Sequence, residues 1–193
     1  MKQRLVGVLC LITAVGAFAQ GQLDFRNRNA TVTPIIDAPI TDIDGTTKLS
    51  GAGFLAQLYF STTGASGSFT AVTDPAAPFR TGAGVGYWDY GADFARTLPA
   101  VVAGSSVWFL VRVWDAASGS FAAAKTTPGG KWGESNNGIG QSVITGGPTT
   151  PPSAPGALIG LTGFKLNQTA VPEPSTIALG VLGAAALLLR RRK

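Results

Sequence analysis

Two aspartates, Asp89 and Asp93, form the best candidate pair of catalytic acids in this sequence. They flank Tyr90 and Gly91, and Tyr87 and Trp88 directly precede Asp89. Two carboxylates beside aromatic rings are what glycoside hydrolysis requires. However, a four-residue separation in such a loop fixes no distance between the carboxyl groups, and aspartates in loops commonly serve turns and caps. We therefore predict no catalytic residue and no enzyme activity, with a glycan hydrolase as the least favoured alternative.

The sequence contains few residues that are suited to metal binding or to nucleophilic catalysis. The 193 residues include no histidine, which removes the commonest general base and the usual ligand of transition metals. Asp42-x-Asp44-Gly45 matches the beginning of a calcium-binding loop, but the third oxygen ligand and the closing bidentate glutamate are missing. We therefore predict a turn between strands at 42–45, with no metal site and no cofactor.

Four tryptophans are candidates for stacking against sugar rings. Trp108 and Trp114 belong to an alternating apolar run, so we expect both in the core. Trp88 and Trp132 lie in glycine-rich stretches, where an exposed indole ring would be available to a ligand. These last two residues are the predicted glycan platform, on which a carbohydrate-binding role would depend.

Strands must position these side chains, because the body of the chain shows a period of two and almost no helical period. The clearest strand covers residues 107–114, with apolar side chains on both faces. One face carries Val107, Phe109, Val111 and Val113, and the other carries Trp108, Leu110, Arg112 and Trp114. A run this rich in β-branched and aromatic residues predicts a central strand.

Further strands are predicted along the rest of the body. A strong one covers 54–60, a last one covers 158–166, and weaker candidates lie at 23–27, 31–36, 69–72, 94–98 and 143–145. Turn sequences such as Asp74-Pro75 separate them. Short strands at this spacing predict an all-β fold, an antiparallel β-sandwich that is either jelly-roll or immunoglobulin-like. This exported domain is predicted at residues 20–166, with the proline-rich stretch 146–156 as an internal loop.

The N-terminus reads as a secretory signal peptide at residues 1–19. Lys2 and Arg4 precede an apolar stretch that forms the signal helix, and Ala17 and Ala19 form an A-x-A cleavage site. The mature chain is then predicted to begin at Gln20. Cys10 is the only cysteine and lies in the removed segment, so we expect a mature domain without disulfides.

The C-terminus predicts a short transmembrane helix at 177–189. Its thirteen residues carry no charge and would span roughly 20 Å of the roughly 30 Å hydrocarbon core. The run is apolar on every face and ends at four cations, which favour the cytoplasmic side of the membrane. The basic tail at 190–193 consists of Arg190, Arg191, Arg192 and Lys193.

The basic charge of the chain belongs to its two ends. The net charge is +5, and the six Lys and Arg residues at the termini account for all of it. Between them, nine basic residues stand against ten acidic ones. A nucleic-acid partner would require basic groups clustered on the folded domain, so we predict no nucleic-acid binding.

A proline-bounded tether is predicted at 167–176, immediately before the apolar run. Pro172, Glu173 and Pro174 hold it extended beside the membrane, where a membrane-embedded processing enzyme can read it. The order of Pro-Glu-Pro, apolar helix and arginine cluster resembles the PEP-CTERM sorting domain of Gram-negative bacteria. The body also resembles, more loosely, small exported PEP-CTERM proteins without known activity.

The resemblance implies processing by an exosortase and delivery to the cell surface or to extracellular polysaccharide. We therefore expect an exported protein that the C-terminal helix holds transiently in the inner membrane. After processing it would lie at the cell surface or in the secreted matrix, with a structural or polysaccharide-associated role. The alternative is a carbohydrate-binding module delivered by the same route.

Overall fold

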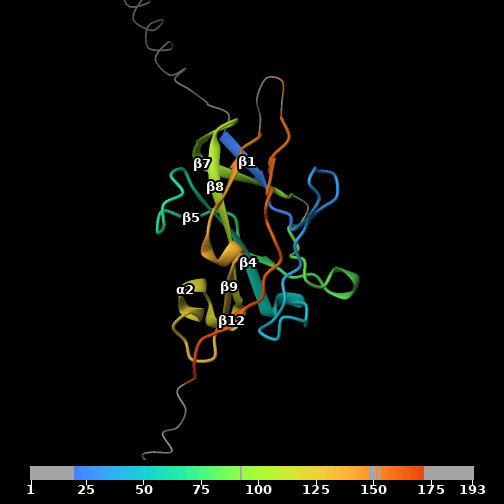
Figure 1. Cartoon of the computed structure of the whole chain (residues 1–193), viewed down its shortest axis with the longest axis vertical. Coiled ribbons are helices and arrows are strands. Elements are labelled where there is room, and N and C mark those ends of the chain that lie inside the picture. The colour runs from blue at the N-terminus through green and yellow to red at the C-terminus, as the bar shows by residue number, and fades with distance from the viewer. Residues whose placement is uncertain (1–19, 92, 148–150, 152, 172–193) are drawn as a thin grey trace, which may run out of the picture.

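The structure, a computed structural model, describes residues 20–91, 93–147, 151 and 153–171. The predicted signal peptide, transmembrane helix and basic tail lie outside these residues. The described chain consists mostly of β-strands in largely antiparallel sheets, with few helices (Figure 1), which confirms the predicted all-β class. No helix within the described ranges has the length and apolar character needed to cross a membrane.

Most of the described strands are short, and three of them are long enough to organise the sheets. The strands are β1 (Gln20–Asp24), β2 (Arg28–Asn29), β3 (Ile36–Asp37), β4 (Phe54–Ser61), β5 (Thr70–Ala71), β6 (Ala77–Pro78), β7 (Ala95–Val102), β8 (Ser106–Asp115), β9 (Lys131–Glu134), β10 (Gln141–Ile144), β11 (Gly156–Ala157) and β12 (Asn167–Gln168). The helical segments are η1 (Gly51–Gly53), η2 (Gly82–Gly84), η3 (Ala116–Ser118), α2 (Phe121–Ala124) and η4 (Ser135–Gly138).

The largest sheet is built around β8. This strand pairs antiparallel with β4 on one side and with β9 and β10 on the other, giving the order β12-β9-β8-β4-β5 with β6 also on β4. Its predicted inward face is fully buried, since Val107, Phe109, Val111 and Val113 are each 0% exposed. The predicted central strand is therefore confirmed.

A second sheet shares the core of the first. It has the order β11-β1-β7, with β1 antiparallel to β7 and parallel to β11. Leu23 of β1 and Leu98 of β7 belong to the same buried cluster as Leu58 of β4 and Val111 of β8. A separate ribbon is formed by β2 and β3, which pair antiparallel.

The outer face of β8 is covered as well. Trp114 packs with Phe121 and Ala124 of α2 in a small second cluster, and its indole ring meets the Phe121 ring edge-on at 6.5 Å. Trp108 is half-buried, and a Cβ added at Gly64 would lie 2.7 Å from its ring. The turn that contains Gly64 therefore packs directly on Trp108.

Several weaker strand predictions are confirmed, and two are wrong. β5, β7 and β10 fall within or across the predicted runs 69–72, 94–98 and 143–145. The stretch 31–36 is mostly turn, and 158–166 contains turns and an isolated bridge instead of a strand. In the latter stretch, Leu158, Leu161 and Leu166 are buried without alternation. A Cβ added at Gly163 would lie 2.5 Å from the Pro39 carbonyl oxygen, so the chain packs closely against the backbone there.

The contact between β11 and β10 provides a test of this packing. A Cβ at Gly156 would lie 2.1 Å from the carbonyl oxygen of Ile144. We expect Gly156→Ala to lower the free energy of unfolding by about 3 kcal/mol or more, because the backbone must shift to relieve the overlap. The matched control is Gly53→Ala, whose added Cβ meets nothing within 4 Å and is expected to change stability by less than about 1 kcal/mol. Urea denaturation measures both, and equal stabilities would contradict the described packing.

Candidate functional site

Trp88 is not an exposed platform, so this sequence prediction is wrong. Its side chain is 0% exposed, stacks on Phe25 at 4.8 Å and meets Phe79 edge-on at 6.5 Å. The indole Nε1 donates a hydrogen bond of 3.0 Å to the Phe25 carbonyl, and the Trp88 backbone N–H donates to Oδ1 of Asn27. Trp88 lies in a glycine-rich stretch whose backbone turns toward the core, and its large apolar ring is buried there.

Trp132 lies in β9, where it is half-buried and lines a surface groove. Its ring meets Phe121 edge-on at 6.0 Å, and Nζ of Lys125 lies 4.6 Å from its ring centroid. Its Nε1 donates a hydrogen bond of 3.2 Å to Oγ1 of Thr169. The indole ring is thus held in one orientation by neighbours on α2 and beyond β12.

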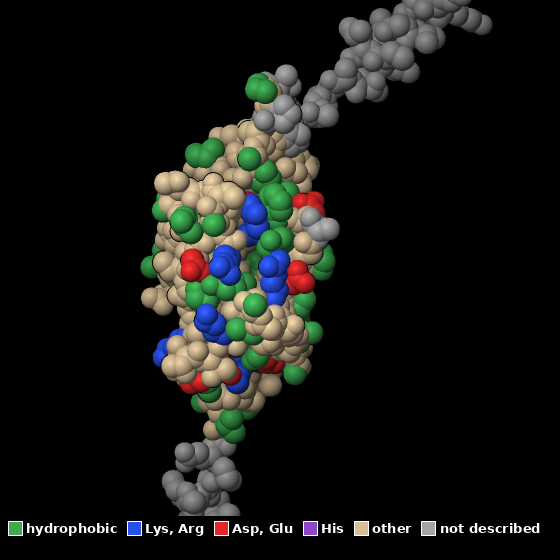
Figure 2. Space-filling view, turned by 90° about the vertical axis from the view of Figure 1, so that its right-hand side faces the viewer, with side chains coloured by type: hydrophobic (Ala, Val, Ile, Leu, Met, Phe, Trp, Pro, Cys, Tyr) green, Lys and Arg blue, Asp and Glu red, His purple; other side chains and the backbone are tan. Residues whose placement is uncertain are grey.

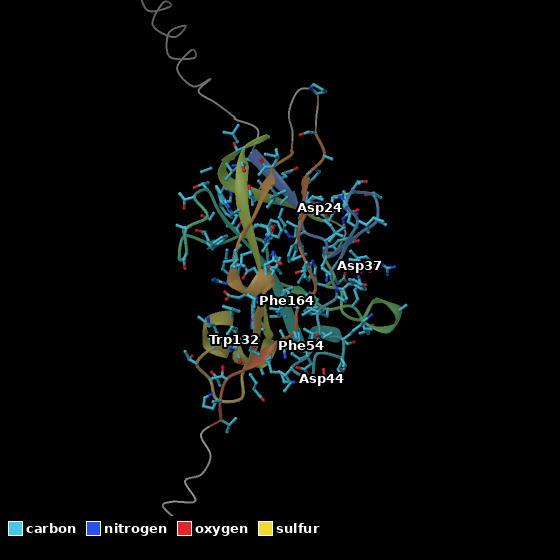
Figure 3. All side chains as sticks on the ribbon, in the orientation of Figure 1. Asp24, Asp37, Asp44, Phe54, Trp132 and Phe164 are labelled. Carbon is cyan, nitrogen blue, oxygen red and sulfur yellow. The ribbon has the colours of Figure 1, made fainter. Side chains whose placement is uncertain are left out.

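The groove is the candidate functional site. It has a volume of about 470 Å³ and lies between the end of β9 with η4 and the segment leading into β12. Figure 3 shows its two aromatic residues, Trp132 and Phe164, in the lower half of the domain. The lining residues are Trp132, Glu134, Asn136, Asn137, Thr162, Gly163, Phe164, Lys165 and Asn167.

A sharp turn at η4 shapes one wall of this groove. Asn136, Asn137 and Gly138 have φ angles of 50°, 56° and 80°, in the left-handed region that asparagine and glycine tolerate best. The hydroxyl of Ser135 accepts the backbone N–H of Val111 at 3.0 Å, which fixes the turn to β8. Oδ1 of Asn136 accepts a hydrogen bond of 2.9 Å from Oγ1 of Thr162 and so joins the two walls.

Several hydrogen-bond donors that line the groove have no partner among the described residues. Oε1 of Glu134 accepts from Nε of Arg112 at 2.8 Å, so this carboxylate is already paired. The side chains of Asn137, Lys165 and Asn167 make no hydrogen bond or ion pair with any described residue. Two amides and one ammonium beside aromatic rings suit a ligand that carries hydroxyl or carboxylate groups.

These groove residues were missed at the sequence level, apart from Trp132. Asn136, Asn137 and Gly138 are adjacent in sequence, and an Asn-Asn-Gly run is a turn signal that points to a left-handed segment. Nothing in the sequence pairs that turn with Phe164 and Lys165, because the contact is made only when both segments pack against β9.

Basic side chains elsewhere on the domain are accompanied by acids and aromatic rings. Figure 2 shows Lys and Arg side chains gathered along one face, with apolar and acidic groups between them. Nε of Arg26 donates to Oδ1 of Asp24 at 2.7 Å, and its guanidinium lies 4.1 Å from the centre of the Phe94 ring. The hydrogen bond to Asp24 raises the pKa of Arg26 above its ordinary value.

The two candidate catalytic acids each cap a local turn. Oδ1 of Asp89 accepts the backbone N–H of Gly91 at 3.2 Å, and Oδ1 of Asp93 accepts that of Ala95 at 2.8 Å. Asp89 also lies 3.8 Å from Nε of Arg80. These are the turn and cap roles expected for aspartates in such a loop. Within the described residues, no three acidic, cysteine or histidine side chains form a group suited to a metal ion.

The Asp42–Asp44 stretch is a turn, as predicted. Oδ2 of Asp42 accepts a hydrogen bond of 2.6 Å from Nζ of Lys131, so this carboxylate already has a cationic partner. Asp44 accepts from the hydroxyl of Thr47 and from the backbone N–H groups of Thr46 and Thr47. These bonds, led by the Thr47 hydroxyl, hold the pKa of Asp44 well below its usual range.

Thr47→Val tests this turn, because it removes the hydroxyl donor and keeps the shape of the side chain. We expect the pKa of Asp44 to rise toward its ordinary value of about 4, as measured by NMR titration of its carboxyl carbon. The folded-state pKa lies below the unfolded value, so Asp44 stabilises the fold above about pH 4 and loses this effect as pH falls through the folded pKa. An Asp44 that titrates near 4 in the unsubstituted protein would contradict the described hydrogen bonds.

The C-terminal end of the chain matches a known family model. Residues 170–193 match the family model of the PEP-CTERM protein-sorting motif. The chain therefore carries a PEP-CTERM motif and is an exported protein of the kind that exosortases process. The match includes Pro172, Glu173 and Pro174 and the basic tail, all outside the described residues. No curated protein and no solved structure matches the chain.

Proposed function

We propose that this protein is a polysaccharide-associated structural component of the cell surface or extracellular matrix, and that the groove beside β9 contacts the glycan. The observation that carries this proposal is the lining of the groove. Trp132 and Phe164 offer apolar ring surface, and Asn137, Lys165 and Asn167 offer donors without partners among the described residues. Aromatic surface with a few polar groups around it is the usual composition of a small-ligand site.

The delivery route is part of the same proposal. The signal peptide at 1–19 is removed after Ala19, and the helix at 177–189 holds the protein transiently in the inner membrane with 190–193 in the cytoplasm. Exosortase then processes the C-terminus and releases the domain toward the surface. The proposed fold is an antiparallel β-sandwich, jelly-roll or immunoglobulin-like, which the core shared by the two sheets supports.

The proposed role is binding without catalysis. The cap hydrogen bonds of Asp89 and Asp93, together with the pairing of Glu134 with Arg112, support this view, because these carboxylates already have partners. A carbohydrate-binding module remains the alternative, and the same groove favours it. The two differ in whether glycan binding is the main activity of the domain or one contact of a structural protein.

Processing at the motif gives the first test of the delivery route. In cells that contain the cognate exosortase, we expect Glu173→Ala, or removal of 190–193, to leave the protein uncleaved or mislocalised. The physical reason is that both changes remove a feature by which the enzyme recognises its substrate at the membrane. Mass spectrometry of the C-terminus of the surface form measures the result. A wild-type surface form that still ends at Lys193 would refute processing.

Glycan contact is tested with polysaccharide extracted from the producing organism. We expect Asn137→Ala combined with Lys165→Ala to weaken binding about tenfold or more, because one neutral and one charged hydrogen bond together contribute roughly 2 kcal/mol. Lys48→Ala is the matched control, since Lys48 is exposed and does not line the groove. Equal binding by the double variant, the control and the wild type would reject the groove as the glycan contact.

A further inference from the structure

The chain that leads into the sorting motif is held on the folded domain. Asn167 and Gln168 form β12 and pair with Trp132 and Lys131 of β9. Thr169 continues the contact, since its N–H donates to the Gly130 carbonyl and its carbonyl accepts the Gly129 N–H, both at 2.9 Å. The predicted tether at 167–176 therefore begins as part of the sheet, and we name residues 167–171 the C-terminal strap.

Hydrogen bonds hold the strap, with almost no burial of its side chains. Asn167, Gln168, Ala170 and Val171 are exposed, and Thr169 is half-buried. Oγ1 of Thr169 donates to the Ala124 carbonyl at 2.7 Å and accepts from Trp132, while Nε2 of Gln168 donates to the Gly129 carbonyl at 3.2 Å. Segments with few buried apolar contacts open at low free-energy cost while the rest of the domain stays folded.

The strap determines how far the sorting motif can lie from the folded domain. While the strap is in place, Thr169 is the last described residue with backbone hydrogen bonds, and Pro172 lies three residues beyond it in the sequence. Pro172 is then at most about 10 Å from the sheet. If the strap opens, the last anchored residue is Leu166, which is 1% exposed and donates its N–H to the Thr41 carbonyl at 3.0 Å. The reach to Pro172 becomes about 20 Å.

While the strap is bound to the domain, its hydrogen bonds also occupy backbone groups that a processing enzyme would need. Enzymes and domains that bind extended peptides commonly do so through main-chain hydrogen bonds. The N–H and carbonyl of Thr169, only three residues before Pro172, are already bonded to the turn at Gly129 and Gly130. A membrane-embedded active site would therefore meet the bulk of the folded domain immediately beside its substrate.

We propose that the strap controls access to the sorting motif, and that it must detach from β9 and from the turn at Gly129 and Gly130 before processing. This inference rests on the proposed function, because it assumes that exosortase cleaves this chain. Strap opening lengthens the free segment next to the membrane and frees its backbone for the enzyme. The rest of the domain remains folded, since Leu166 stays anchored in the core.

A disulfide across the strap tests the requirement for opening. Gln168 and Lys131 are directly opposed in an antiparallel pair, where Cα atoms lie about 4.5–5.5 Å apart, within the range that a disulfide spans. The full-length Gln168→Cys/Lys131→Cys variant is expressed in cells with the cognate exosortase, and its C-terminus is measured by mass spectrometry. The native sequence contains only one cysteine, Cys10, so only one other thiol could form a disulfide with the engineered pair.

We expect the oxidised variant to be processed at least about tenfold more slowly than wild type, because the competent open population is removed. A reductant added to the cells should restore processing. The matched control is Ser106→Cys/Ile144→Cys, which links the opposed residues of β8 and β10 in the same sheet and should be processed normally. The single variants Gln168→Cys and Lys131→Cys control for the lost side chains, including the Lys131–Asp42 ion pair.

Weakening the strap gives the opposite test. Thr169→Val removes the hydroxyl bonds to Ala124 and Trp132 and should accelerate processing, whereas Thr62→Val, at an exposed threonine, should not. Normal processing of the oxidised Gln168→Cys/Lys131→Cys variant would overturn the proposal. Failure of the wild type to be processed at all would refute the proposed function itself, so the two failures are distinguishable.

Discussion

The double-sided burial of β8 is the constraint on which the rest of the structure depends. On one face the alternate residues Val107, Phe109, Val111 and Val113 fill the main core, and on the other Trp114 meets Phe121 of α2. A strand covered on both sides must satisfy its backbone through neighbouring strands, because buried N–H and carbonyl groups without partners are costly. The pairings with β4, β9 and β10 meet this requirement, and the pairing with β9 positions Trp132 and Glu134 in the groove.

The groove and the C-terminal strap share one boundary of this sheet. Trp132 and Asn167 are opposed across β9 and β12, and both line the groove. The same indole donates its N–H to Thr169, within the strap. The groove and the C-terminal strap therefore meet at Trp132, which lines the groove and is hydrogen-bonded to the strap.

The fold could be predicted where burial is encoded by alternation along one strand. The two faces of β8 and the apolar face of β4 follow from a period of two, since each side chain is on the opposite side from the next. The prediction failed for 158–166 and for Trp88. In both places, glycine-containing chain outside the longer strands carries large apolar side chains into the core, and local periodicity does not encode this.

The sequence by itself determined the destination signal, because the order of Pro-Glu-Pro, apolar run and basic cluster is linear and needs no folded neighbour to be recognised. It also determined the β class, which follows from local spacing. Only the tertiary structure decided that Trp88 is core, that Asn137 and Lys165 face one groove, and that the chain before the motif is strapped to β9. Each of these depends on residues far apart in sequence, brought together by packing that local spacing does not describe.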